Sequence, residues 1–189
     1  MKHVKMLSLT AIAAAALMAF VGASTASTAN LYSTGVKLPL GTSIHATLQA
    51  GSTAILSTTD GSSIFNTCSA STVEGEVDST GGATVTGNID ALTWGPTCSV
   101  TTDTLTNGTL HVDSAGTVRG TGSVVTWNIG VSCRYGTGGG TILGTLNTGK
   151  HAINAVINEQ EPKAFLCADT TRLTASYTVT APHDLTAGV

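Results

Sequence analysis

Residues 72–89 read TVEGEVDSTGGATVTGNI, and this stretch indicates the fold of the chain. Val73 and Val77 lie on one face of the first run, because side chains alternate between the two faces of a strand. Val85 and Ile89 mark the matching face of the second run. Two consecutive glycines between the runs suit a tight turn. The stretch therefore predicts an antiparallel hairpin with one buried face and one solvated, acidic face.

Short alternating runs of the same kind recur on both sides of the hairpin, separated by Gly, Ser, Asp or Asn. Residues 123–134 and 173–180 are the long runs, and we expect them to be central strands because each carries a continuous apolar row. The rows are Val125, Trp127, Ile129, Val131 and Cys133 in the first run and Leu173, Ala175, Tyr177 and Val179 in the second. Further strands are expected at residues 43–48, 109–112, 116–119, 142–146 and 152–158. The chain after Pro182 is expected to be loose.

Strands at intervals of about 8–12 residues, with turn signals between them, predict an all-β fold built from antiparallel strands. The architecture is either a β-sandwich or a small barrel. Gly75, Gly87 and Gly130 fall inside expected strands, where bulges or bends begin, and they favour the sandwich. Residues 30–189 are long enough for one domain with a core of its own.

The composition supports the same fold class and excludes some partners. Thr is the most frequent residue, and its branched Cβ suits pleated strands. Charged residues make up 10% of the chain, and residues 30–189 retain six of the eight Lys and Arg residues and all eleven acidic residues, a net charge of −5. So few basic residues argue against nucleic acid as a partner and against electrostatic binding to anionic membranes.

Residues 1–29 have the three parts of a secretory signal peptide. A short basic start is followed by the apolar run 6–21, which is short for a transmembrane helix, and then by small residues. We place the cleavage after Ala29, with Ala23 or Ala26 as alternatives. The sequence thus predicts an exported protein, secreted or at the cell surface, with no transmembrane segment in the mature chain.

The four cysteines all lie in the mature region, and an even number in an exported chain predicts disulfides. Four cysteines allow three pairings. We favour Cys68 with Cys98, which flank the hairpin, and Cys133 with Cys167, which flank the two long strands. No Cys-x-x-Cys occurs and no His lies within a few residues of a Cys, so zinc-binding and thioredoxin-like spacings are absent.

No catalytic, cofactor-binding or metal-binding residue is predicted. The mature histidines are dispersed singly, without a nucleophile motif, as His45, His111, His151 and His183. Glu74 and Glu76 share a strand face and could hold calcium or act as an acid–base pair, but without an Asp-rich loop they are interpreted as a solvated face.

Three other features also have structural interpretations. The Gly-rich residues 135–144 lack the lysine and helix of a phosphate cradle, so they are expected to form a flexible hairpin loop between two strands. Trp94, next to a Gly-Pro turn, could be exposed as on a carbohydrate-binding surface, but one aromatic residue is not a stacking platform. Trp127 is expected in the core, and Asn107 begins a glycosylation sequon.

Landmarks along the mature chain resemble those of exported bacterial four-cysteine β proteins. They are VKLPLGTS at residues 36–43, Cys68, VTG at 85–87, Cys98, CRYG at 133–136, Cys167 and YTVTAP at 177–182. The chain is also distantly similar to the secreted proteins named as activators of alkane oxidation, which are associated with cell surfaces and biofilm. The resemblance implies a β fold with structural cysteines and no active site.

Three hypotheses follow for function. The first is a non-enzymatic structural or adhesive protein of the cell surface or matrix, because low charge and high β-propensity favour self-association by strand addition. The alternative is a protein that binds a small apolar ligand, a lipid or hydrocarbon, since many apolar residues but few large side chains could leave an unfilled interior. The third is a hydrolase with dispersed residues, tested at His45, His111 and His151.

Overall fold

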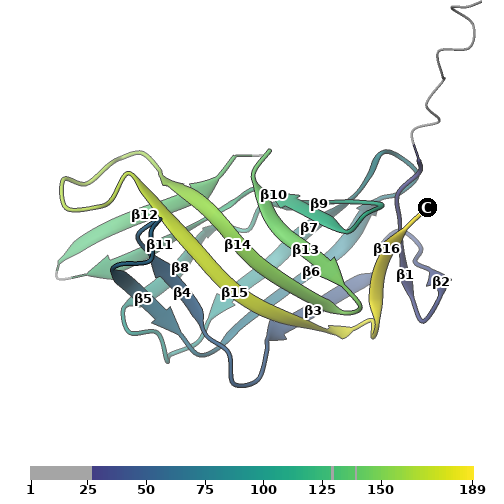
Figure 1. Ribbon diagram of the computed structural model, residues 1–189, viewed down its shortest axis with the longest axis horizontal. Coiled ribbons are helices and arrows are strands. Elements are labelled where there is room, and N and C mark those ends of the chain that lie inside the picture. Colours follow the sequence, from purple (N-terminus) through teal and green to yellow (C-terminus); the bar gives the residue numbers. More distant parts are fainter. Residues whose placement is uncertain (1–26, 129, 139) are drawn as a thin grey trace, which may run out of the picture.

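The computed structural model describes residues 27–128, 130–138 and 140–189, whose strands run obliquely along an elongated body (Figure 1). The predicted hairpin is confirmed: β6 (Ser71–Ser79) pairs antiparallel with β7 (Thr84–Trp94). Val77 and Val85 are each 1% exposed. The pairing shifts at Asp90, where β7 has one extra residue, and this bulge bends the strand.

Eight antiparallel strands form a closed ring, so the sheet is a barrel. In order around the ring they are β15 (Thr170–Ala181), β3 (Ser43–Leu48), β6, β7, β9 (Thr109–Asp113), β10 (Thr117–Gly120), β13 (Ile142–Asn147) and β14 (Lys150–Glu159). The predicted all-β antiparallel fold is confirmed, and of the two expected architectures the chain adopts the barrel. The five shorter strands expected around the hairpin correspond to β3, β9, β10, β13 and β14.

Two ring strands are longer than the ring and carry a second group of strands, called here the extension. The first half of β15 pairs with β4 (Ala54–Ser57), which pairs with β5 (Ile64–Cys68). The last residues of β14 pair with β12 (Val131–Thr137). Beyond β12 lie β11 (Gly122–Asn128) and β8 (Thr101–Thr106). The extension therefore prolongs the barrel along its axis.

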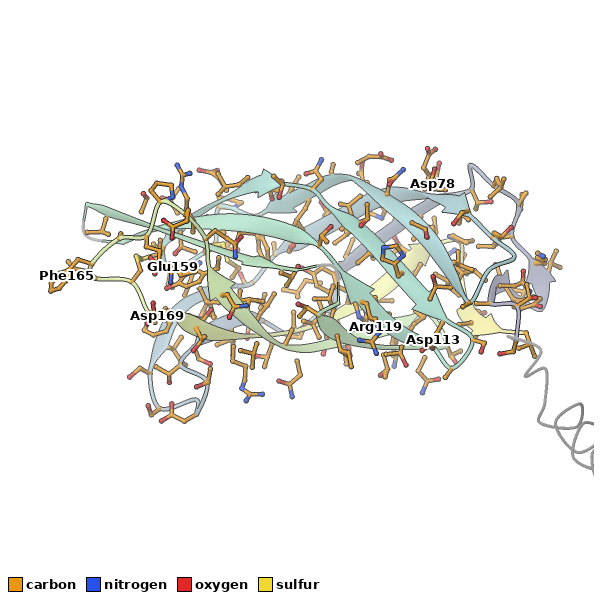
Figure 2. The ribbon with its side chains drawn as sticks, turned by 90° about the horizontal axis from the view of Figure 1, so that it is seen from above. Asp78, Asp113, Arg119, Glu159, Phe165 and Asp169 are labelled. Atoms are coloured by element: carbon orange, nitrogen blue, oxygen red, sulfur yellow. A yellow bond between two sulfur atoms is a disulfide. The ribbon has the colours of Figure 1, made fainter. Side chains whose placement is uncertain are left out.

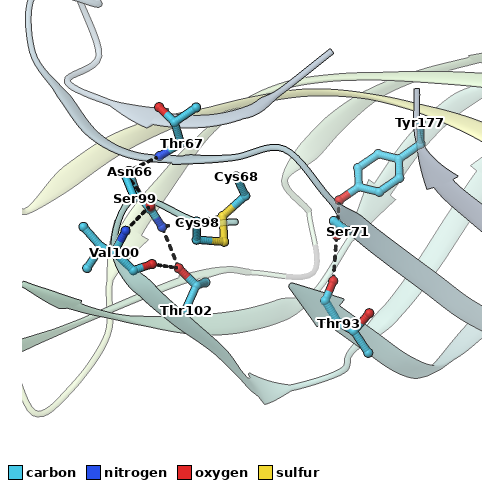
Figure 3. The surroundings of a disulfide bond; sticks show 10 residues. All are labelled: Asn66, Thr67, Cys68, Ser71, Thr93, Cys98, Ser99, Val100, Thr102 and Tyr177. Atoms are coloured by element: carbon cyan, nitrogen blue, oxygen red, sulfur yellow. Dashed lines mark hydrogen bonds between the residues drawn. A yellow bond between two sulfur atoms is a disulfide. The ribbon is translucent and has the colours of Figure 1, made fainter. Parts of the chain in front are cut away.

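Both predicted disulfides are confirmed and belong to the extension. Cys68–Cys98 joins the end of β5 to the segment before β8, where Thr67 N donates to Ser99 Oγ at 3.0 Å (Figure 3). Ser99 N in turn donates to the Thr67 carbonyl at 2.8 Å. Cys133–Cys167 ties β12 to the loop between β14 and β15. Loops of this length correspond to a stabilisation of roughly 3–4 kcal/mol per bridge in the chain-entropy model.

A small sheet of the two chain ends covers the other end of the barrel, where β16, β1 and β2 lie side by side in Figure 1. It consists of β1 (Asn30–Ser33), β2 (Val36–Lys37) and β16 (Leu185–Gly188). Leu31 and Leu185 are buried in the same cluster as Val77. The expectation of a loose chain after Pro182 is thus wrong, because pairing with the distant β1 orders it.

The expectation of one long strand at residues 123–134 is also wrong. Asn128 pairs with Val131, so the stretch is a hairpin of β11 and β12 that turns at Gly130, whose φ is +80°. Glycine tolerates this left-handed conformation without strain. Thr126 is buried and Val124 lines the cavity, so these even-numbered residues of β11 face inward. Ile129 and the side chains of Val125 and Trp127 lie outside the described part.

The second apolar row is confirmed on β15, where Ala175, Tyr177 and Val179 are buried. Leu173 packs beside them against a second cluster formed by Leu56, Tyr135, Ala155 and Ile157. Ile153 of β14 contacts both clusters. The core is therefore continuous from the terminal sheet into the extension.

Candidate functional site

An apolar cavity lies inside the barrel. Its volume is about 210 Å³, and its walls include Ile44, Val112 and Leu146 of the ring. Lining residues reach from Leu185 of the terminal sheet to Tyr135 of the extension, so the space is long and narrow. An apolar cavity of about 150 Å³ in another protein holds benzene or xenon. This cavity is therefore large enough for a small organic molecule.

Small inward residues explain why the interior is not filled. Ala46 and the two strand glycines Gly75 and Gly87 all line the cavity. A Cβ on Gly75 would collide with the carbonyl oxygen of Asn88, and a Cβ on Gly87 would lie 3.1 Å from that of Glu76. The close approach of β6 and β7 thus requires glycine at position 75 and leaves little room for a Cβ at position 87, and glycine leaves space where another residue would fill the core.

A buried hydrogen-bond chain crosses the interior beside the cavity (Figure 3). Tyr177 Oη donates to Ser71 Oγ at 2.9 Å, and Ser71 Oγ donates to the carbonyl of Thr93 at 2.8 Å. Burial raises the pKa of Tyr177, so its hydroxyl stays protonated. This chain links β15 to β6 and β7 across the barrel and satisfies its own polar groups.

His151 is a polar residue in the cavity wall that has no such partner. It stands on β14 directly opposite Tyr177 of β15, in phase with the inward residues Ile153 and Ala155. Its Nε2 is buried, and neither ring nitrogen forms a hydrogen bond with another described residue. The ring keeps some accessible surface, as expected for a side chain that lines a cavity. Burial lowers the pKa of His151 to about 4, so the imidazole is neutral at pH 7.

Trp94 is the second unpartnered polar group of the cavity. It lines the wall at the end of β7, and its indole Nε1 is buried without a hydrogen-bond partner among the described residues. Its strand neighbour is Ser71, the acceptor of the Tyr177 hydroxyl. Trp94 therefore faces inward, which makes the carbohydrate-surface interpretation wrong.

The other predicted candidates lie outside the cavity, except that the exposed Glu76 borders it. Glu74 and Glu76 are exposed on the outer face of β6, as expected, and the described residues contain no group of three or more His, Cys, Asp or Glu side chains suited to a metal. His111 Nδ1 lies 3.2 Å from Thr86 Oγ1 on β7. The structure does not bring these side chains together with His151.

His45 has the contacts that most resemble catalytic ones. Its Nδ1 lies 2.6 Å from Thr180 Oγ1, and its Nε2 lies 3.6 Å from Glu74 Oε1. The second distance exceeds a hydrogen bond, and both side chains are well exposed. A substrate would therefore find no enclosed site here.

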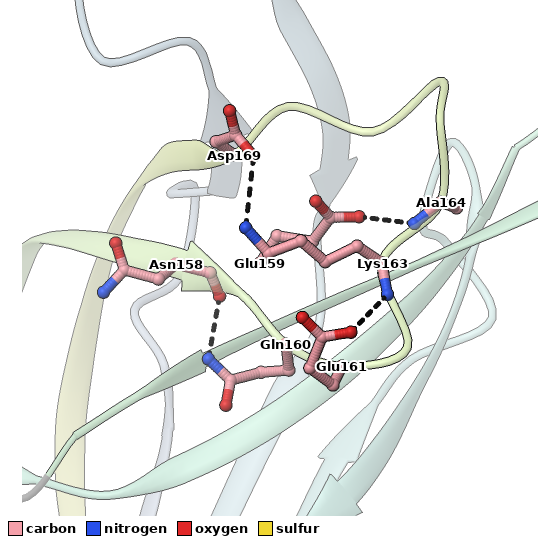
Figure 4. A network of polar contacts seen from close by, with 7 residues as sticks. All are labelled: Asn158, Glu159, Gln160, Glu161, Lys163, Ala164 and Asp169. Carbon is pink, nitrogen blue, oxygen red and sulfur yellow. Dashed lines mark hydrogen bonds and ion pairs between the residues drawn. The ribbon is translucent and has the colours of Figure 1, made fainter.

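A separate polar group fixes the loop between β14 and β15 (Figure 4). Buried Glu159 accepts a hydrogen bond from Ala164 N at 2.9 Å, and its own N–H donates to the Asp169 carbonyl at 2.9 Å. Burial raises the pKa of Tyr135, which pairs with Glu159 across β12 and β14. These contacts are satisfied within the loop, so we assign them a structural role. The expectation of a hairpin loop over residues 135–144 is wrong: the range begins within β12 and ends within β13, and these strands do not pair with each other but each with β14.

The sequence contained a signal for His151 that strand prediction alone missed. In residues 150–159, His151, Ile153, Ala155 and Ile157 alternate at period two, so the imidazole is in phase with the apolar row. Trp94 is likewise in phase with Leu92. Neither pattern indicates that the apolar row encloses a cavity.

Comparison with known proteins leaves the site to be interpreted on its own. Neither a known protein family, nor a curated protein, nor a solved structure matches this chain. The resemblance to four-cysteine exported proteins therefore stays a prediction. The described part of the chain contains no helix long and apolar enough to cross a membrane.

Proposed function

We propose that this protein binds a small apolar molecule, a lipid fragment or hydrocarbon, inside its barrel. The observation that supports this function best is the apolar cavity of about 210 Å³ that extends along the axis. Liquid water takes up about 30 Å³ per molecule, so the space corresponds to about seven waters or a ligand of roughly eight heavy atoms. A narrow cavity favours an unbranched chain over a bulky ring system.

The barrel suits this role because its wall is a closed, rigid scaffold. Each ring strand pairs on both sides, and the terminal sheet covers one end with Leu31 and Leu185. Small barrels of this kind hold one ligand where their interior side chains leave room. Transfer of an eight-carbon chain from water into such a space gains about 0.8 kcal/mol per buried methylene.

Binding of n-octane, measured by headspace partition over the mature protein, tests the proposal. We expect saturable uptake of one octane per chain. Ala46→Leu, which adds volume inside the cavity, is expected to weaken uptake at least tenfold. Ala152→Leu adds the same volume on the exposed outer face of β14 and serves as the matched control. Absence of saturable uptake, or equal uptake by both variants, would refute an internal site.

A second proposed role, attachment at a cell surface or matrix and self-association, is favoured by one exposed apolar tip. Phe165 is 100% exposed and Leu166 is 73% exposed. Figure 2 places Phe165 at the opposite end of the molecule from the terminal sheet. The Cys133–Cys167 disulfide and the Glu159–Ala164 hydrogen bond hold the loop that presents them. Because the ring strands have no free edge, such contacts would use side chains rather than strand addition.

Sedimentation at rising concentration tests this second role. We expect oligomers of the wild-type chain that disappear in the Phe165→Ser, Leu166→Ser double variant, which leaves the barrel unchanged. The matched variant Val156→Ser removes another exposed apolar residue, on the outer face of β14, and is expected to behave as wild type. Strictly monomeric wild-type protein that binds no cell-envelope material would remove this role.

We also propose that the protein acts outside the cytoplasm, secreted or at the cell surface. Two disulfides are consistent with an oxidising compartment, and the predicted signal peptide gives the route of export. Residues 1–26 of that peptide lie outside the described residues.

A further inference from the structure

We propose, building on the internal ligand site, that the ligand is a neutral amphiphile whose single oxygen hydrogen-bonds with His151 and Trp94. A medium-chain alcohol or ketone is the chemical class that fits. The cavity would then select its ligand by one polar contact within an apolar channel, in the usual manner of small-molecule sites.

The unpaired imidazole is the first observation. His151 lies in a wall of apolar side chains, with Ile153 beside it on β14 and Leu146 opposite it on β13. An unpaired buried polar group costs stability, and a hydrophobic residue of similar size would avoid that cost. A neutral imidazole offers one N–H donor and one acceptor nitrogen, so it can bind a hydroxyl or a carbonyl oxygen.

The unpaired indole is the second, independent observation. Trp94 Nε1 is a donor only, buried in the same cavity and without a partner among the described residues. Tyr177 connects the two positions, since it is the strand neighbour of His151 and its hydroxyl bonds to Ser71, the strand neighbour of Trp94. The two unpaired residues are thus connected through the Tyr177–Ser71 hydrogen bond, in which the Tyr177 hydroxyl is already satisfied.

The charge of the lining determines that the ligand's oxygen is neutral. Among the described lining residues there is no Lys or Arg, and the one carboxylate is Glu76 of β6, exposed to solvent. A carboxylate ligand would therefore be buried without a cation, which is costly. Burial also opposes the protonation of His151 that such an anion would need. An alcohol or ketone requires neither change.

The test compares n-octane, 1-octanol and octanoate at pH 7.5 on the mature protein and on three variants. His151→Phe removes the imidazole and keeps an aromatic ring, with His151→Leu as the substitute if the larger ring does not fold. Trp94→Phe removes the indole N–H. His111→Phe, on the outer face, is the matched control. Thermal unfolding of each variant confirms that it is folded.

We expect 1-octanol affinity to fall about tenfold in His151→Phe and less in Trp94→Phe, while n-octane affinity is unchanged. One neutral hydrogen bond corresponds to a change of about this size. Octanoate is expected to bind most weakly. If the affinities for octane and octanol change equally in the variants, the inference is overturned but the apolar site is retained. The same conclusion follows if octanoate binds most tightly. If neither octane nor octanol binds the wild-type protein, the proposed function fails as well.

Discussion

The eight-stranded ring and the extension are closed in different ways, although they share β14 and β15. The ring closes by backbone hydrogen bonds alone, and none of the four cysteines lies on its strands. The extension closes through two disulfides, side-chain bonds such as Val100 N to Asn66 Oδ1 at 3.1 Å, and one isolated β-bridge between Cys68 and Cys98 (Figure 3). Covalent links reinforce the closure where strand pairing is reduced to a single bridge.

The two regions also differ in how they treat polar groups inside. In the extension, Glu159 and Asn66 are buried and bonded, so their role is to hold loops and strands. In the ring, His151 Nε2 and Trp94 Nε1 are buried and unpaired beside the cavity, whereas Thr171 Oγ1, on the half of β15 that carries the extension, is buried and unpaired but does not line the cavity. We infer that the extension serves structure and the ring serves binding.

Removal of the Cys133–Cys167 bridge by two alanine substitutions would break the extension first. We expect the free energy of unfolding to fall by roughly 3–4 kcal/mol, with faster hydrogen exchange in β11 and β12 than in β6 and β7. The double variant Cys68→Ala, Cys98→Ala is the matched comparison, because the two bridges close loops of similar length. The paired cysteines are 30 residues apart in this bridge and 34 residues apart in Cys133–Cys167. Equal loss of protection in the ring would contradict the proposed division.

Leu185→Ala would weaken the ring at its covered end. Leu185 is 3% exposed and packs in the same apolar cluster as Val77. We therefore expect the free energy of unfolding, measured with urea, to fall by about 3 kcal/mol. Leu166→Ala removes the same side chain from the exposed tip and should change stability by less than about 0.5 kcal/mol. Similar losses for both would show that the terminal sheet contributes little.

The pH dependence of stability distinguishes His151 from the surface histidines. Because its pKa falls from 6.5 to about 4 on folding, the unfolded chain binds the proton more tightly. Its contribution to stability is complete above pH 6.5 and is lost as the pH falls toward 4, by about 2–3 kcal/mol. When the free energy of unfolding is plotted against pH, His151→Phe should lack this loss between pH 6.5 and 4, whereas His111→Phe should keep it. An identical slope in both variants would contradict the burial of His151.

Tyr177→Phe should have the smallest effect of the series. The change removes the hydroxyl that donates to Ser71, and we expect a loss of about 1 kcal/mol in chemical unfolding. Tyr32→Phe removes an exposed hydroxyl bonded to the Val189 carbonyl in the terminal sheet and should cost less. A larger loss for Tyr32 would argue against a structural role for the buried chain.

Local patterns predicted the parts of this fold that depend on neighbours in sequence. Valines and a Gly-Gly turn were enough for the β6–β7 hairpin, and the apolar row of β15 was read correctly. The Cys68–Cys98 pair followed from the hairpin that folds back between the two cysteines, whereas the Cys133–Cys167 pair was predicted from a long strand at 123–134 that the structure replaces with a hairpin. The all-β class followed from composition, because Thr and Gly favour strands and turns.

Long-range pairing explains what the sequence did not reveal. The strand β8, TTDTLT, has no apolar alternation, and β16 pairs with β1, which is distant in the sequence. The apolar residues of 123–134 alternate at period two on both sides of Gly130, so the pattern of this hairpin was the same as that of one long strand. The site was missed for the same reason: the alternation puts His151 in phase with Ile153, but only ring closure shows that this face encloses a cavity.

The structure also sharpens the predicted cleavage site. Ala29 has 0% exposed surface, and its N–H donates to the Gly82 carbonyl at 2.9 Å. Cleavage after Ala26, one of the three expected positions, would keep this buried residue, and we expect N-terminal sequencing of the exported protein to begin at Ser27. A mature chain that begins at Asn30 would contradict this expectation.

The most direct test of the central claim is a crystal structure of the mature protein under xenon pressure, since xenon enters dry apolar cavities. The account predicts xenon inside the ring, between Ile44, Val112 and Ile153. A ring interior that takes up no xenon, with these side chains in contact across the axis, would contradict it.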